Sequence, residues 1–215
     1  MRHAFEPDHL AAVSTMVAEQ KSAKASVSYA TAWGVGHALV LTVMATALLG
    51  LRKQLPESVS NLFEVGVGVM LIVLGVRALR QARAQGRSPE RAVAHTHGGT
   101  THAHGGVSKH LHVARFTLAK RPLFVGIVHG LAGSGALVAV AVPQTTSMLH
   151  GVLFVALYGV GAAIGMAALA GVLGAPLARI AKSPKGTAAL LGLSGAVSLC
   201  VGLTWGAFAL VRTFG

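Results

Sequence analysis

Five long apolar segments constrain the fold of this chain more than any other feature. They cover residues 29–50, 62–79, 123–143, 151–173 and 187–211. Each is close to the roughly 20 residues that an α-helix needs to cross a bilayer. Only 11% of the residues are charged, whereas about a quarter are charged in a soluble domain. We therefore expect an all-α fold, a polytopic bundle of membrane-spanning helices.

The opening segment, residues 4–18, predicts a sixth helix. It carries Glu6, Asp8 and His9, and its hydropathy alone would not mark it as a membrane span. Polar side chains at membrane depth are tolerated where they face the interior of a bundle. We expect this helix to be buried among the other five.

Basic residues concentrate in the segments that would join these helices on one side of the membrane. The chain has a formal net charge of +12. Most of its Lys and Arg residues lie in 19–28, 80–122 and 175–186. The positive-inside rule then makes this side cytoplasmic and puts both termini outside. Because only 5% of residues are aromatic, and the basic residues sit in short runs between apolar stretches, nucleic acid is not an expected partner.

The two halves of the chain resemble each other. Residues 2–15 align with 128–141, WGVGHALVL (33–41) aligns with YGVGAAIGM (158–166), and FEVGVGVMLIVLG aligns with LLGLSGAVSLCVG. Three helices per half would make the second half enter the membrane inverted, which is typical of transporters. We expect two inverted three-helix repeats, 1–79 and 123–215, joined by a basic loop, 80–122.

Pairs of glycines four residues apart predict close helix packing. These pairs are Gly126/Gly130, Gly161/Gly165 and Gly202/Gly206.

Nitrogen and oxygen donors are crowded into the first nine residues. His3, Glu6, Asp8 and His9 surround Pro7. Proline disfavours helix at the residue before it, so a break at Glu6 would let His3 approach Asp8 and His9. Such donors belong together if they bind a cation, and imidazole with carboxylate suits Ni, Co, Zn, Cu and Fe.

Two more histidines, His37 and His129, fall within predicted spans. An intramembrane histidine either contributes to a functional site or forms a hydrogen bond between helices. Residue type alone leaves both alternatives open.

The motif HAFEPDH fits the H-x4-D-H signature of the nickel/cobalt transporter family. The whole chain resembles the six-helix, urease-accessory (UreH-like) branch of that family, in which a GxGHA helix, a His-rich loop and an HGLAGSGAL helix follow. The resemblance implies an inner-membrane permease for Ni²⁺ or Co²⁺ with His3, Asp8 and His9 as ligands and His37 along the path. It also implies uptake for a nickel enzyme such as urease, with cytoplasmic nickel chaperones or urease accessory proteins as partners.

The resembling proteins have an apolar half-helix before this motif, so we expect the native chain to extend upstream of Met1. A free amine at Met1 would offer the alternative of an amine-x-His chelate for Ni²⁺ or Cu²⁺.

A histidine-rich segment interrupts the basic loop. Residues 95–112 read HTHGGTTHAHGGVSKHLH and have little apolar surface to bury, so we expect no fixed structure. Neutral imidazoles bind divalent metals and release them on protonation. The segment is either an accessory metal buffer or a solvated linker. Its histidines are His95, His97, His102, His104, His110 and His112.

We therefore expect a secondary transporter and not an enzyme, with no prosthetic group. Its site would combine Glu6, His3, Asp8, His9 and His37 with His129 and Ser134 from the second half. Without a G-x-x-x-x-G-K loop the chain cannot hydrolyse ATP itself. A nickel/cobalt efflux permease is the main alternative. A membrane metalloenzyme with histidine boxes is a remote one, because His3, His37 and His129 lie in separate spans.

Overall fold

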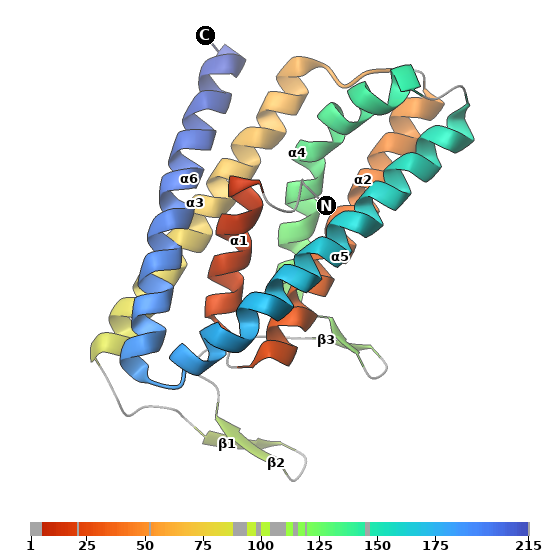
Figure 1. Ribbon diagram of the computed structural model, residues 1–215. Helices are drawn as coiled ribbons and strands as arrows, with labels where there is room; N and C mark the ends of the chain where they lie inside the picture. The colour runs from red at the N-terminus through yellow and green to blue at the C-terminus, as the bar shows by residue number, and fades with distance from the viewer. Residues whose placement is uncertain are drawn as a thin grey trace.

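The described part of the chain forms six α-helices, and Figure 1 shows their arrangement in the computed structural model. The structure describes residues 6–20, 22–51, 53–87, 94–97, 100–103, 111–113, 116–118, 120–144 and 147–214. The helices are α1 (Pro7–Ala18), α2 (Ala23–Gly50), α3 (Glu57–Arg87), α4 (Lys120–Gln144), α5 (Met148–Ile180) and α6 (Pro184–Phe214). The prediction of a six-helix bundle is confirmed.

Four of the helices are long and apolar enough to cross a membrane, counting only the residues that the structure describes. They are α2, the Glu57–Gln85 part of α3, α5 and α6. Exposed apolar side chains lie along them, for example Leu39, Val69, Leu157 and Leu203. A large apolar surface of this kind is expected of helices that face lipid. The chain is a membrane protein by length and composition of its helices.

Helix α1 is short because proline and an extended residue mark its start. Glu6 is the N-cap, with φ −64° and ψ 147°, and Pro7 takes the first helical position. Proline is well tolerated there because its missing N–H would have no intrahelical partner. The expected departure from helix at Glu6 is confirmed, whereas His3 lies outside the described residues.

The 12 residues of α1 span about 18 Å, well short of a hydrocarbon core of about 30 Å. In Figure 1 α1 accordingly begins part-way along the bundle, between the α3–α6 pair and the group of α2, α4 and α5. Nine of its residues are buried, including Asp8 and His9. Thr15 Oγ1 also reaches α6, lying 3.2 Å from the carbonyl oxygen of Ser194. The predicted burial of this helix is confirmed.

Glycines let neighbouring helices approach to backbone contact. A Cβ on Gly126 of α4 would collide with the carbonyl oxygen of Trp33 in α2, and one on Gly130 would lie 2.8 Å from the carbonyl oxygen of His37. Gly202 of α6 packs against Gly68 of α3. These contacts confirm the predicted glycine pairs at 126/130 and 202/206. The prediction is wrong for Gly161, where an added Cβ meets no atom within 4 Å, because the helix turns that residue away from its neighbours.

Among the described residues, two short hairpins overlap the histidine-rich segment and the residues just after it, whereas the segment was expected to lack fixed structure. Strand β1 (Ala94–His97) pairs with β2 (Thr100–Ala103), and β3 (Leu111–Val113) pairs with β4 (Phe116–Leu118). Threonine and valine favour extended backbone, which suits them to these paired strands. Both hairpins lie at one end of the bundle (Figure 1), called the hairpin end below.

The glycine contacts predict how a single methyl group affects stability. Gly126→Ala should lower the unfolding temperature in detergent, by the equivalent of about 1–3 kcal/mol, because the added Cβ has no space between α4 and α2. Gly161→Ala is the matched control and should be neutral or slightly stabilising, since alanine is the better helix former. Thermal unfolding of both variants, followed by circular dichroism, checks this. Equal unfolding temperatures would contradict the assigned packing.

Candidate metal centre

Three buried side chains from two helices form a group of potential metal ligands: Asp8 and His9 from α1, and His129 from α4. Each is at most 6% exposed. One ligand atom from each side chain lies within 4.8 Å of the other two. This is the only such group found in the described part of the chain.

Asp8 connects the two histidines. Its Oδ2 lies 2.9 Å from His129 Nε2, and its Oδ1 lies 3.2 Å from His9 Nδ1. The backbone N–H of His9 also donates to Oδ1, over 2.9 Å. Asp8 stands in the first turn of α1, where the helix dipole favours a negative charge. The carboxylate is therefore well stabilised although it is buried.

The spacing of the donors is close to that of a coordination shell. Ligand atoms about 2.1 Å from a divalent ion lie roughly 3 to 4 Å apart. The 4.8 Å limit observed here is slightly larger, so small side-chain rotations would suffice for all three to reach one ion. The group mixes two imidazoles with a carboxylate, a donor set suited to Ni²⁺, Co²⁺ and Zn²⁺.

The depth of α1 and the glycines of α4 explain why these residues meet. Because α1 begins part-way along the bundle, its first turn places Asp8 and His9 in the interior. His129 lies between Gly126 and Gly130, two positions at which α4 comes into close contact with the backbone of α2. Larger residues there would hold α4, and with it His129, away from the other helices.

A further histidine and a tryptophan of α2 pack beside the group. The ring of His37 lies 5.3 Å from that of His9 and 6.4 Å from that of His129, measured between centroids. The ring of Trp33 lies 5.5 Å from His9 and 5.6 Å from His129. Trp33 and His37 are four residues apart and so share one face of α2. Both are fully buried.

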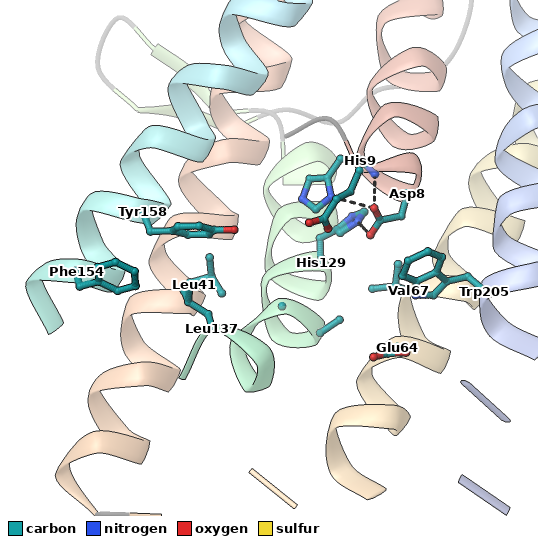
Figure 2. Close-up of a pocket in the computed structure, with 13 residues that line it drawn as sticks. Asp8, His9, Leu41, Glu64, Val67, His129, Leu137, Phe154, Tyr158 and Trp205 are labelled. Atoms are coloured by element: carbon teal, nitrogen blue, oxygen red, sulfur yellow. Dashed lines mark hydrogen bonds and ion pairs between the residues drawn. The ribbon is translucent and has the colours of Figure 1, made fainter. Parts of the chain in front are cut away.

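A cavity of about 370 Å³ adjoins the group and is shown in Figure 2. Asp8, His9 and His129 line the cavity in the interior of the bundle. From these residues the cavity continues toward the end of the bundle away from the hairpins (Figure 2). The remaining lining residues are Glu6, Leu41, Glu64, Val67, Ala132, Gly133, Leu137, Phe154, Tyr158 and Trp205.

The other predicted site residues are placed as follows. Glu6 lines the cavity. Ser134 is buried but does not line it, and its hydroxyl donates to the carbonyl oxygen of Leu131 over 2.7 Å. His95 pairs with His102 across the first hairpin, His97 pairs with Thr100, and His112 pairs with Thr117 in the second. His3, His104 and His110 lie outside the described residues.

Sequence reasoning missed two aromatic residues near the group. Trp33 was used only to align the repeats, although its spacing of four from His37 signals a shared face. Tyr158, which lines the cavity, was likewise used only in the alignment, as the counterpart of Trp33. Its position depends on how α5 packs against α2.

Comparisons with known proteins agree with the donor chemistry. The profile of the NicO family, described as high-affinity nickel-transport protein, matches residues 1–182. The chain is also 28% identical over 209 residues to the urease accessory protein UreH of Bacillus sp. (strain TB-90), covering 94% of this chain and 85% of that protein. No solved structure matches the chain significantly. The family match covers most of the chain, and the chain belongs to the NicO family of nickel-transport proteins.

Proposed function

We propose that this protein is a secondary permease for Ni²⁺, and also for Co²⁺, with Asp8, His9 and His129 as the central ligands. The observation that carries the proposal is the convergence of three buried donors from two helices on one cavity in the interior of the bundle. Ionisable groups are costly at membrane depth, and those that occur there mark ion paths. Membership of a nickel-transport family supports the same substrate.

The contact between His129 and Asp8 supports a shared ion. Nε2 of His129 lies 2.9 Å from Oδ2 of Asp8, so these two atoms could bind the same cation once the proton between them is released. The remaining ring proton of the neutral imidazole would then be on Nδ1. His37 would stand beside the ion, and His3 remains a ligand expected from the H-x4-D-H spacing.

The two ends of the bundle differ in a way that supports alternating access. The cavity reaches from the ligands toward the end away from the hairpins. At the hairpin end an ion-pair network joins three helices. Nη1 of Arg121, in the first turn of α4, lies 2.6 Å from Oε2 of Glu19, which follows α1. Nε of Arg77 in α3 lies 3.8 Å from Oε1 of the same carboxylate. This state would be open on one side of the site and closed on the other.

Reciprocal contacts support an inverted repeat. A Cβ on Gly34 would lie 2.8 Å from Cα of Ala163, and one on Gly159 would lie 3.0 Å from Cα of Ala38. The sequence alignment matches Gly34 with Gly159 and Ala38 with Ala163. Each residue thus contacts the counterpart of the other's partner, as two-fold symmetry requires.

The third helices of the two halves follow the same rule. A Cβ on Gly68 would lie 3.0 Å from the carbonyl oxygen of Gly202, and one on Gly75 would lie 2.7 Å from that of Gly195. The alignment matches Gly68 with Gly195 and Gly75 with Gly202. We infer that α1–α3 and α4–α6 are related by a pseudo-two-fold axis, which allows the same bundle to open toward either side.

We infer uptake across a bacterial inner membrane, with the basic hairpin end in the cytoplasm and both termini outside. The basic residues support this orientation, and the cavity would then face the outside. The relative named as a urease accessory protein supports nickel supply to urease, with nickel chaperones or accessory proteins receiving the ion. Efflux of nickel or cobalt is the alternative direction.

Nickel accumulation tests the site and the direction together. Cells that produce the protein should accumulate more radiolabelled Ni²⁺, and His9→Ala, Asp8→Asn and His129→Ala should each reduce its initial rate at least roughly tenfold, since ligand loss weakens metal binding. His150→Ala is the control, because His150 is an exposed histidine at the start of α5. Normal uptake in all three site variants would overturn the proposed site, and lower accumulation with the protein present would establish efflux.

The ion-pair network at the hairpin end predicts a conformational effect. Glu19→Gln should weaken the link between α1, α3 and α4. A cysteine introduced at Gln20, which lies between α1 and α2, should then react faster with a thiol-labelling reagent in a Cys200→Ser background. Lys24→Gln, an exposed charge near the same end, should leave the labelling rate unchanged. An unchanged rate in Glu19→Gln would show that these ion pairs do not hold the end closed.

The histidine-rich segment would act as an accessory metal buffer. Deleting residues 95–112 should change the sensitivity of cells to nickel while preserving most of the initial uptake rate, because the central ligands lie in α1 and α4. A matched variant with all six histidines replaced by asparagine keeps the length and should behave like the deletion. Complete loss of uptake would contradict the accessory role.

A further inference from the structure

A carboxylate outside the ligand group lines the same cavity. Glu64, near the start of α3, is on the cavity wall at the end away from the hairpins. In Figure 2 its side chain lies well apart from Asp8, His9 and His129, on the far side of Val67 and Trp205. Its side chain is 22% exposed, compared with 9% or less for the three ligands. Glu64 therefore occupies the solvent-facing part of the cavity, which we call the mouth.

Glu64 forms an ion pair with Arg212, whose position has other support as well. Nη2 of Arg212 lies 2.7 Å from Oε2 of Glu64. Arg212 is in the last turn of α6, where the helix dipole favours a positive charge. Nε of the arginine side chain also donates to the carbonyl oxygen of Phe208, one turn earlier in α6, over 3.5 Å. The arginine can therefore keep its place when the carboxylate changes partner.

The pair is weak enough to exchange. The side chain of Arg212 is 55% exposed, and ion pairs in contact with water contribute little stability because solvent screens them. A divalent cation carries twice the charge of a guanidinium and can approach a carboxylate oxygen more closely. Such a cation can displace Arg212 from Glu64, whereas a monovalent cation has no such advantage.

We propose that Glu64 is the first protein ligand of the transported cation, and that Arg212 is the counter-ion that the cation displaces. This inference rests on the proposed function. A hydrated divalent cation exchanges one water for the oxygen of Glu64 at the mouth and then passes to the nitrogen and oxygen donors at mid-depth. Arg212 returns to Glu64 behind it.

The two stages divide the work of recognition. A single carboxylate oxygen is a hard donor that binds Mg²⁺ and Ca²⁺ as well as Ni²⁺, and so discriminates little among these cations. Imidazole nitrogens discriminate in favour of Ni²⁺ and Co²⁺. Glu64 would therefore set how efficiently cations are captured, whereas His9 and His129 would set which cation is transported.

A charge cycle at the mouth tests the inference. In vesicles containing the purified protein, Glu64→Gln should raise the KM for Ni²⁺ transport roughly threefold to fivefold, the scale of one solvent-exposed charge interaction, with little change in kcat. Arg212→Gln should lower KM and increase inhibition by Mg²⁺, because the carboxylate is no longer neutralised. In the double variant the effect of Arg212→Gln should vanish. Glu57→Gln, an exposed carboxylate on the same helix that does not line the cavity, is the control.

Equilibrium binding separates this inference from the proposed function. Trp33 and Trp205 are the two tryptophans of the chain; Trp33 packs beside the ligands and Trp205 lines the cavity. Bound Co²⁺ is paramagnetic and should quench Trp33, followed alone in a Trp205→Phe background. Glu64→Gln should leave this quenching unchanged, and Asp8→Asn should abolish it.

Each outcome decides one of the two. Quenching and transport that survive Asp8→Asn and His9→Ala would overturn the proposed site, whatever Glu64 does. Suppose instead that quenching and transport are lost in Asp8→Asn and His9→Ala, but that the KM for Ni²⁺ is unchanged in Glu64→Gln and Arg212→Gln. That result would overturn only the role of Glu64 and Arg212 at the mouth. Loss of quenching in Glu64→Gln, in a protein with a normal unfolding temperature, would make Glu64 a central ligand and also overturn that role.

Discussion

The rest of the structure depends on the contacts that the buried carboxylate of Asp8 makes with two histidines. The carboxylate joins His9 on its own helix to His129 on α4, at 3.2 and 2.9 Å. A carboxylate inside an apolar bundle is stable only with hydrogen-bonding or charged partners. The short helix α1 must therefore start close to α4, and α4 must lie close enough to offer a histidine. The same arrangement creates a set of donors that a divalent cation can use.

Two packing features meet this requirement. Gly126 and Gly130 remove the side chains that would keep α4 away from α2, so His129 is brought in together with Trp33 and His37. Helix α1 is followed by Glu19, which forms ion pairs with Arg77 and Arg121 at the hairpin end. The site is consequently tied to the hairpin end through α1 itself, whereas its other side adjoins a cavity. This asymmetry is what a transporter needs in one of its states.

The sequence predicted the helices well because their signal is local. Long apolar runs and the glycine pairs at 126/130 and 202/206 led to elements and contacts that the structure contains. The prediction failed where the outcome depended on orientation about a helix axis, as at Gly161, which faces open space. It also missed the two hairpins, since strands of three or four residues are too short for an alternating pattern to be recognised.

For the candidate site, the sequence by itself determined that Asp8 and His9 are adjacent, follow Pro7 and belong to a buried helix. It could not determine the partner of Asp8, because an isolated histidine in a span has several possible uses. Only the tertiary structure decided that His129 takes this place and that Trp33 packs beside it. The physical reason is that helix pairing brings together residues more than a hundred positions apart, and the depth at which α1 begins sets which of them meet.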